Sequence, residues 1–269
     1  MKELCLSANF DLPEDVKKAI NECADNEESQ LCLRALAQIT ENIEIAHSEE
    51  LPLCQDTGIV SVFLELGQEV TIKGGRLNEA INQGVREAYL EGYLRKSIVS
   101  DPIFDRLNTG DNTPAVIYYD IVEGDKLKII VMPKGAGSEN MCAIRMLKPS
   151  DGLLGLEEFV LETVKNADGN PCPPIIVGVG VGGTMEQAAL LSKKALARNL
   201  NQEYTDKRYS ELAVRLLKKI NGLGIGAQGF GGSITALSVN ILSFPTHIAT
   251  FPVAVSINCH AARHKEVIL

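Results

Sequence analysis

One segment restricts the fold of this chain more than any other, because it offers no polar side to solvent. The run from Ile175 to Val181 contains only Ile, Val and Gly, which is typical of a β-strand that is buried on both faces. Thr184 follows it, and Gln187 stands three residues later, a spacing that predicts a helix whose first turn is closed by a capping box. A doubly buried strand followed directly by a helix indicates an α/β fold.

Periodicity predicts the other elements. Helices are expected where apolar residues recur at helical spacing, over residues 14–24, 28–47, 76–94, 153–166 and 206–220. Strand-like runs lie at 59–66, 115–122, 126–132, 234–242 and 253–257, and Glu123-Gly124-Asp125 between two of them signals a hairpin. We expect an α/β fold of mixed β-sheets surrounded by helices, formed by residues 1–269 as a single domain on which residues 1–50 pack as a helical N-terminal segment.

The charge of the chain excludes one class of partner. Its 269 residues include 26 basic and 35 acidic side chains, which gives a formal net charge of −9. Nonspecific binding to nucleic acid requires clustered Lys and Arg, so it is not expected here. No apolar run is long enough to cross a membrane, and the N-terminus lacks the apolar core of a signal peptide. We therefore expect a cytoplasmic protein.

Seven cysteines are the chemically distinctive feature of the composition. Their number is odd and no two form a C-x-x-C pair, which excludes the usual structural zinc sites and thioredoxin chemistry. Cys23 and Cys32 fall within helical patterns, where core packing explains them. Any functional cysteines must therefore converge from distant parts of the chain.

Three cysteines lie at the ends of predicted elements, beside polar or proline residues. Cys54 separates a helix from a strand, Cys172 precedes the doubly buried strand, and Cys259 follows the last strand. Functional loops occupy such positions, and three thiolates from separate loops can hold an iron–sulfur cluster with one iron left open. Spacing alone favours the alternative, which is three ordinary buried thiols.

Three glycine-rich segments lie at element boundaries, at 134–140, 178–183 and 222–233. Such turns expose backbone N–H groups that can hold an anion, and for 222–233 an anion pocket and a purely structural turn are equally consistent with the composition. The segment 178–183 matches G-x-G-x-x-G, but no acidic residue ends a second strand at the expected distance. Tight packing of a strand on a helix is therefore favoured there over a nucleotide-binding domain.

Six segments make the sequence recognisable. They are 52–58 (Pro-Leu-Cys-Gln-Asp-Thr-Gly), 108–114 (Asn-Thr-Gly-Asp-Asn-Thr-Pro), 134–140, 172–174 (Cys-Pro-Pro), 224–233 and 257–264 (Ile-Asn-Cys-His-Ala-Ala-Arg-His). Together, in colinear order from about residue 30 to the C-terminus, they resemble the alpha subunit of class I fumarate hydratase, or the N-terminal half of its single-chain form. The related tartrate dehydratase alpha subunit is similar in outline but differs at 137–140 and 258–263.

The resemblance implies a hydro-lyase that interconverts fumarate and (S)-malate through an iron–sulfur cluster. The cluster cysteines of the family match Cys54, Cys172 and Cys259, which are expected to hold a [4Fe–4S] cluster whose open iron acts as a Lewis acid. Because that iron has no thiolate to protect it, the enzyme is also expected to be oxygen-sensitive.

The resemblance further implies a set of substrate-contacting residues. The matching positions are Gln55, Asp56, Arg95, Gly137 and His247, of which Asp56 and His247 are expected to be catalytic. Asp56 is expected to transfer a proton to the leaving hydroxyl, with the capping of a turn as its alternative role. Arg95 is expected to clamp a carboxylate. Supporting roles only are expected for Lys134, His260 and His264.

The resemblance also implies a partner. In single-chain members of the family a second domain follows this region, whereas this chain ends at Leu269 and leaves no unclaimed Lys, Thr or Arg set in a catalytic loop. We therefore expect a separate fumarate hydratase beta subunit, an α2β2 assembly and a step of the tricarboxylic acid cycle. The alternatives are an L(+)-tartrate dehydratase alpha subunit and a non-catalytic iron–sulfur protein, which would need the cysteines but not Asp56, Arg95 and His247.

Overall fold

The computed structural model describes residues 1–269, and the chain divides into two compact units. Unit 1 comprises Met1–Pro13, Asn42–Ala136 and Arg263–Leu269, and unit 2 comprises Glu14–Glu41 and Gly137–Ala262. Each unit contains a four-stranded sheet with helices packed on it, and the chain begins with helices, so the expected α/β class with mixed sheets is confirmed. The two units are regions that pack more densely within themselves than with each other. Our expectation of a single domain over residues 1–269 stays a prediction.

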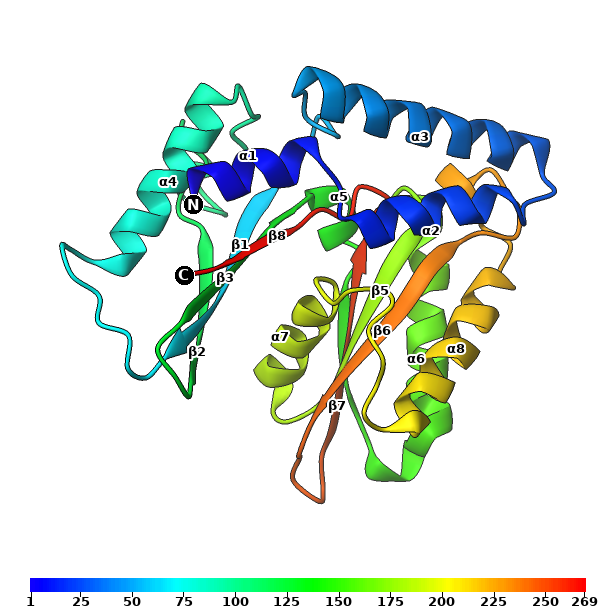
Figure 1. Ribbon diagram of the computed structural model, residues 1–269. Helices are drawn as coiled ribbons and strands as arrows, with labels where there is room; N and C mark the ends of the chain where they lie inside the picture. The colour runs from blue at the N-terminus through cyan, green and yellow to red at the C-terminus, as the bar shows by residue number, and fades with distance from the viewer. The chain divides into compact units, whose positions relative to one another are not determined.

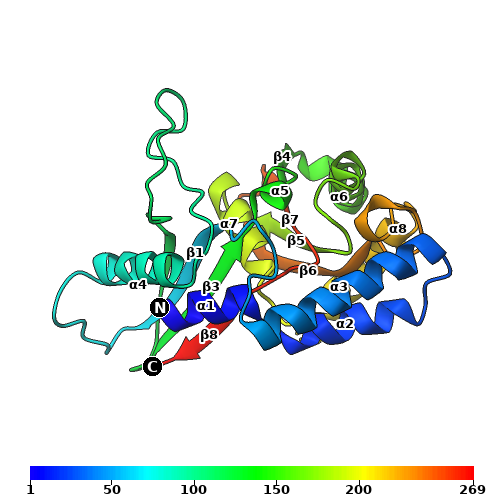
Figure 2. The same ribbon diagram turned by 90° about the horizontal axis from the view of Figure 1, so that it is seen from above.

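The sheet of unit 1 has the order β2-β1-β3-β8, with β1 parallel to β2 and antiparallel to β3. The elements of this unit are α1 (Lys2–Phe10), β1 (Ile59–Gly67), α4 (Leu77–Glu91), β2 (Val116–Val122), β3 (Leu127–Lys134), β8 (Lys265–Ile268) and the part of α3 from Asn42 on. Alternate residues of β1, among them Val60 and Val62, form the core with α1 and α4, which cover one face of the sheet (Figure 1). The loop between α4 and β2 projects from this unit (Figure 2).

The hairpin expected around Glu123-Gly124-Asp125 is wrong. Both strands form, but β1 lies between them in the sheet. The connection crosses the end of β1 at Gly67, where a Cβ would lie only 2.4 Å from the Gly124 carbonyl oxygen. Most of β1 is buried whereas most of β2 is exposed, so β1 takes the central position and β2 forms the edge.

The sheet of unit 2 has the order β4-β7-β5-β6, with β5 parallel to β6 and antiparallel to β7. Its elements are α2 (Glu14–Ala24), α3 (Gln30–Glu49, shared with unit 1), α5 (Ala136–Glu139, whose first residue belongs to unit 1), β4 (Ala143–Leu147), η1 (Pro149–Asp151), α6 (Gly152–Ala167), β5 (Ile175–Gly182), α7 (Met185–Ala195), α8 (Lys207–Asn221), η2 (Ala227–Gly229), β6 (Ala236–Phe244) and β7 (Phe251–Asn258). Val177 and Val179 of β5 join the core with α6 and α8, and α7 packs on the opposite face (Figure 1). The doubly buried strand predicted here is confirmed.

Two glycines of β5 allow α7 to approach the sheet closely. A Cβ on Gly178 would lie 2.2 Å from the Ser192 carbonyl oxygen, and a Cβ on Gly180 would lie 2.0 Å from the carbonyl oxygen of Ala188. Real Cβ atoms do not approach other atoms so closely, so any side chain would push α7 away. Tight packing of strand on helix is therefore confirmed as the reason for this glycine pattern.

The helix ends agree only in part with the sequence. Asp206 caps α8 by accepting the Arg208 N–H at 3.0 Å, and the helix ends at Gly222 as predicted. The capping box predicted for α7 is wrong, because the Thr184 hydroxyl donates to the Glu186 carboxylate at 2.6 Å and makes no cap bond. The short elements β4, α5 and β8 carry no periodic signal and were not predicted. None of the helices combines the length and the apolar character that a membrane crossing requires.

We expect Gly180→Ala to lower the free energy of unfolding by about 2 kcal/mol, because the added methyl group overlaps the Ala188 carbonyl oxygen and displaces α7. Urea unfolding followed by circular dichroism measures the change. Gly222→Ala is the matched control, since Gly222 has a φ of −67° and an added Cβ there meets no atom closer than 3.3 Å. An unchanged unfolding midpoint for Gly180→Ala would contradict the packing described here.

Candidate active site

The loop that carries Cys54 is held by the carboxylate of Asp56. Oδ1 of Asp56 accepts the Gly58 N–H at 3.0 Å, and Oδ2 accepts the Ala136 N–H at 2.8 Å. The Asp56 N–H points back to Sγ of Cys54 at 3.4 Å. Asp56 therefore does cap a turn, and each of its oxygens still has a lone pair for a further donor.

Three buried residues that the sequence analysis did not single out hold the same loop. Arg263, Tyr89 and Asn112 donate hydrogen bonds to the carbonyl oxygens of residues 56, 57 and 58 respectively. Burial raises the pKa of Tyr89, which keeps its hydroxyl a donor. Asn112 and Arg263 lie within two of the recognisable segments, whereas Tyr89 was visible only as one residue of an apolar helix face.

Arg95 and Gln55 present exposed side chains on and beside this loop. The Thr57 hydroxyl donates to the Arg95 carbonyl oxygen at 2.9 Å, which ties the backbone beyond α4 to the loop. Lys134, by contrast, is fully buried at the end of β3. Unit 1 therefore gathers a thiol, a carboxylate, an amide and a guanidinium around one loop.

Cys172 and Cys259 lie at the same end of the unit 2 sheet. Cys172 precedes β5, Cys259 follows β7, and these antiparallel strands pair Ile176 with Asn258. His260 joins the two loops, since its N–H donates to the Cys172 carbonyl oxygen at 3.3 Å and its Nδ1 lies 3.0 Å from the same oxygen. Two of the three loop cysteines are thus brought together within one unit.

Gly137 lies near this end of the sheet, and His247 does not. A Cβ on Gly137 would lie 4.0 Å from the carbonyl oxygen of Asn170, just before Cys172. His247 is exposed in the connection between β6 and β7, where the neighbouring Thr246 hydroxyl donates to the Gly183 carbonyl oxygen at 2.9 Å. The eight residues of β5 separate the two ends by about 25 Å.

The remaining cysteines are packed in the interior to different degrees. Burial raises the pKa of Cys5 to about 12 and that of Cys23 to about 11, and it also raises the pKa of Cys32. Cys23 and Cys32 belong to one apolar cluster, so their expected packing role is confirmed. Cys142 is half-buried, and its Sγ accepts the Ile257 N–H at 3.4 Å. Neither unit gathers three or more His, Cys, Asp or Glu side chains in a metal-binding arrangement.

The glycine-rich segment 222–233 binds the carboxylate of Glu27, a residue of the same chain. Oε2 of the buried Glu27 accepts the Ser233 N–H at 2.8 Å, the Ser233 hydroxyl at 3.1 Å and the Ile234 N–H at 3.2 Å. Gly232 has a φ of 123°, and a Cβ on it would lie 2.8 Å from the same oxygen. Burial by itself would raise the pKa of Glu27, but its hydrogen bonds outweigh burial and lower the pKa. Of the two alternatives, the structure shows the structural turn.

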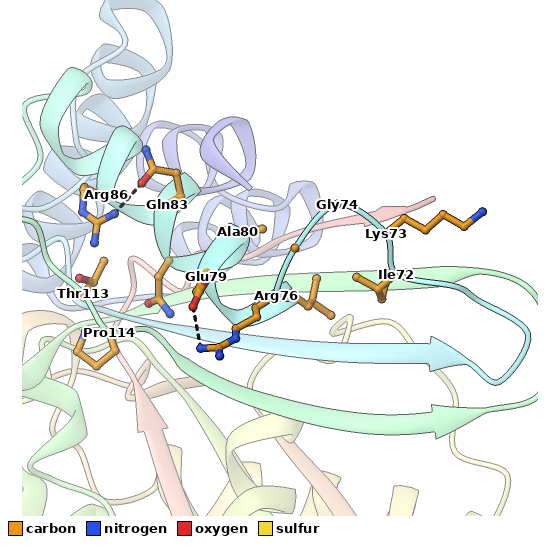
Figure 3. A pocket seen from close by; sticks show the side chains of 13 residues that line it. Ile72, Lys73, Gly74, Arg76, Glu79, Ala80, Gln83, Arg86, Thr113 and Pro114 are labelled. Atoms are coloured by element: carbon orange, nitrogen blue, oxygen red, sulfur yellow. Dashed lines mark hydrogen bonds and ion pairs between the residues drawn. The ribbon is translucent and has the colours of Figure 1, made fainter.

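A cavity of about 750 Å³ lies elsewhere in unit 1, between the loop 72–76, the start of α4 and the segment 113–114 (Figure 3). Two arginines that line it bond to side chains of α4: Arg76 contacts Glu79 at 3.1 Å, and Arg86 donates to the Gln83 amide oxygen at 2.6 Å. None of the predicted site residues lines this cavity. The predicted site residues therefore lie in the loops described above, each within its own unit.

Comparison with known proteins relates the chain to hydro-lyases. Residues 1–268 match the family model described as Fumarate hydratase (Fumerase). A Methanocaldococcus jannaschii protein provisionally named L(+)-tartrate dehydratase subunit alpha is 46% identical over 265 residues, which are 97% of this chain and 93% of the relative. The L(+)-tartrate dehydratase alpha subunit of Escherichia coli O157:H7 is 34% identical over 262 residues, which are 96% of this chain and 86% of the relative. These names do not support the expected place in the tricarboxylic acid cycle.

The burial of the thiols predicts their order of alkylation in the native, metal-free chain. Iodoacetamide attacks the thiolate, so we expect Cys172, which is exposed, to react at least tenfold faster than Cys5, whose pKa is raised to about 12. Mass spectrometry of tryptic peptides at successive times measures both rates, and urea-unfolded protein, in which all seven thiols should react alike, is the control. Equal rates in the native protein would contradict the burial described.

Proposed function

This chain belongs to the fumarate hydratase (Fumerase) family of hydro-lyases, and we propose that it is the alpha subunit of an iron–sulfur enzyme that interconverts fumarate and (S)-malate. The observation that carries this proposal is the loop of unit 1 that presents Cys54, Gln55 and Asp56, with the backbone of Arg95 tied to it through Thr57. A thiol for the cofactor, an acid–base group and an anion-binding cation are the components that dehydration of a hydroxy diacid requires.

The three loop cysteines fit an iron–sulfur cluster by their chemistry. Thiolates are the ligands of such clusters. Cys172 is exposed and Cys54 and Cys259 are partly exposed, so their sulfurs can reach a cluster without disruption of a core, whereas Cys5 and Cys32 are buried. We propose that these three loop cysteines hold a [4Fe–4S] cluster. Such a cluster, when bound, supplies Lewis-acid polarisation of a hydroxyl or carboxylate oxygen at its open iron.

Arg95 is the proposed clamp for one substrate carboxylate. Its planar guanidinium can donate to both carboxylate oxygens at once. The Gln55 amide and the Gly137 N–H are proposed as neutral donors to the substrate. Donors on the carboxylate that gains charge facilitate loss of the neighbouring carbon-bound proton, and the base that removes this proton is proposed to come from a partner subunit.

Asp56 is proposed to transfer the proton at the substrate oxygen. Its two carboxylate oxygens each accept one backbone N–H, at 3.0 and 2.8 Å, which holds the group in one orientation. In dehydration its protonated form gives the proton to the leaving hydroxyl, which departs as water. In hydration its carboxylate takes a proton from the attacking water, as a general base requires.

His247 is proposed to act in the site of a second copy of the chain. It stands about 25 Å along the unit 2 sheet from Cys172, so it cannot reach a substrate held beside that cysteine in the same unit. Its Nδ1 accepts the Ala249 N–H at 3.2 Å, which leaves Nε2 for another partner. Phe244 at the end of β6 and Ile248 in the same connection are exposed apolar residues, and burial between two copies would agree with an α2β2 assembly.

A separate beta subunit is the proposed second component. The relatives from Methanocaldococcus jannaschii and Escherichia coli are both named as alpha subunits, which is what supports a partner of a different sequence. Such a subunit would exclude water from the substrate and supply further cations around a dianion. We propose that it is a fumarate hydratase beta subunit, or a tartrate dehydratase beta subunit if the second candidate function below holds.

L(+)-tartrate dehydration is the second candidate function, because the named relatives are tartrate dehydratase alpha subunits. Both reactions expel a hydroxyl group next to a carbon that loses a proton, so the residues proposed above would serve either. Tartrate has an additional hydroxyl group, which a specialised site must hydrogen-bond. A site built around such a hydroxyl strongly rejects the analogue that lacks it.

Parallel assays with fumarate, malate and tartrate decide between the two. We expect fumarate hydration by the anaerobically reconstituted enzyme, with its partner subunit, to have a kcat/KM at least about 100-fold above that for tartrate. The formation or loss of fumarate at 240 nm and a coupled assay for oxaloacetate are the measurements. The opposite ratio would identify tartrate dehydratase, and no turnover of any of the three would contradict both candidates.

Substitution of Asp56 separates an enzyme from a non-catalytic iron–sulfur protein. We expect Asp56→Asn to lower kcat by about 10² to 10⁴ through loss of the proton-transfer group, while the visible absorbance of the cluster stays. Asn also turns an N–H donor toward one of the two backbone N–H groups, so we expect a loss of about 1–2 kcal/mol in stability.

The matched control for this substitution is Asp101→Asn. Asp101 also caps a turn in unit 1, where its Oδ1 accepts the N–H groups of Ile103 and Phe104. Because only one oxygen of Asp101 accepts these bonds, Asn can keep that acceptor, so this variant should be destabilised less than Asp56→Asn and should keep its kcat. If Asp56→Asn were as active as the wild type, Asp56 would not be the proton-transfer group, and only cluster binding would remain as the role of this site.

A further inference from the structure

We propose that Gln228 is a positioning residue for Cys172, and that hydrogen bonds from the glycine-rich turn let it hold the backbone of this cysteine and of the residue that follows it, directly at Pro173 and through His260 at Cys172. The proposal deepens the proposed function, since it rests on Cys172 being a cluster ligand. All residues that carry it lie within unit 2.

The contacts of Gln228 converge on the segment around Cys172. Its backbone N–H and its side-chain Nε2 both donate to the Pro173 carbonyl oxygen, each at 2.8 Å. The same Nε2 lies 3.1 Å from Nδ1 of His260, and His260 in turn donates its N–H to the Cys172 carbonyl oxygen. One side chain therefore links the carbonyl groups of Cys172 and of the residue after it.

Backbone conformation argues that the Gln228 side chain is needed. Gln228 has a φ of 55° and Cys172 has a φ of 54°, a left-handed region that is unfavourable for residues other than glycine. Glycines surround Gln228 in the turn, at positions 226, 229, 231 and 232. Glycine at 228 would remove the strain there, so a glutamine is explained by what its amide does at Pro173 and His260.

The turn that carries Gln228 is itself held by hydrogen bonds to Cys32 and Glu27, so the backbone at Gln228 has a defined position. The Ala227 N–H donates to Sγ of the buried Cys32 at 3.1 Å, and Glu27 holds the end of the turn through Ser233. Gly229 packs against the segment that precedes Cys172, since a Cβ on Gly169 would lie 3.2 Å from the Gly229 Cα. The α2–α3 connection thus orients Cys172 through the turn.

Cys172 depends on these hydrogen bonds because it has little packing of its own. Cys172 is exposed, so its side chain gains little orientation from the core. Residues that orient metal ligands by hydrogen bonds, without binding the metal themselves, typically contribute about 10- to 100-fold to metal affinity. We therefore expect Gln228 to set how firmly Cys172 holds a cluster, without contact to the substrate.

Two substitutions and one control test this. Gln228→Gly removes the amide and relieves the φ strain while it keeps the N–H that donates to Pro173, and Gln228→Glu replaces the amide donor with an acceptor that faces a carbonyl oxygen. Gln202→Leu, on an exposed loop of the same unit, is the matched control. Hydrogen–deuterium exchange of the iron-free full-length chain measures the amides of Cys172 and His260.

We expect those two amides to exchange at least tenfold faster in both Gln228 variants, while the thermal midpoint of Gln228→Gly stays at or above that of the wild type. After anaerobic reconstitution, loss of cluster absorbance to an iron chelator should be about tenfold faster in these variants. Gln202→Leu should behave as the wild type in all measurements.

Two results would overturn the proposal. One is wild-type exchange at Cys172 and His260 in Gln228→Gly. The other is faster exchange throughout unit 2 in proportion to a lower midpoint, which would show a general structural role. If the wild type takes up no cluster, the proposed function fails, whereas exchange in the iron-free chain still decides the role of Gln228.

Discussion

Hydrogen bonds from backbone N–H groups to a carboxylate hold both candidate loop regions in place. Asp56 accepts two N–H groups in unit 1, and Glu27 accepts those of Ser233 and Ile234 in unit 2. Tight turns leave such groups without a partner from regular structure, and a buried unsatisfied group costs about 1–3 kcal/mol. The glycine-rich segments have few side chains to pack, so their shape depends on these bonds, and the loops beside Cys54 and Cys172 depend on that shape.

Environment, and not residue type, distinguishes the cysteines. Cys5 and Cys32 are buried, and burial raises the pKa of each thiol. Cys32 still has a task as an acceptor for the Ala227 N–H at 3.1 Å, behind the turn that contacts the Cys172 segment. Cys172 lies just before a strand and has a left-handed φ of 54°. Hydrogen bonds, and not core packing, hold its backbone there. One residue type thus serves as core, as backbone acceptor and as candidate ligand.

Much of the fold could be predicted from periodicity. Helix α2 has the predicted bounds, Glu14–Ala24, and β5 is the doubly buried strand that the composition of its run indicates. The errors arise where local signals compete with tertiary packing. The segment around Gly124 has the composition of a hairpin turn, but β1 is more buried than β2 and takes the place between β2 and β3. Thr184 can cap, but its hydroxyl binds the Glu186 carboxylate instead.

Of the candidate site residues, Cys54, Gln55 and Asp56 are adjacent and belong to a recognisable segment, whereas Arg95 could be named only through the family resemblance. The residues that hold those loops come from far away: Glu27 and Ser233 are 206 positions apart, and Arg263 and Asp56 are 207 apart. Local sequence determined the strands, the helices and the glycines of close approach, because side-chain period and φ are properties of neighbouring residues. Tertiary structure alone decided which carboxylate holds which loop and that His247 stands at the opposite end of the sheet from Cys172, because a hydrogen bond or a separation between distant residues exists only once the chain has folded.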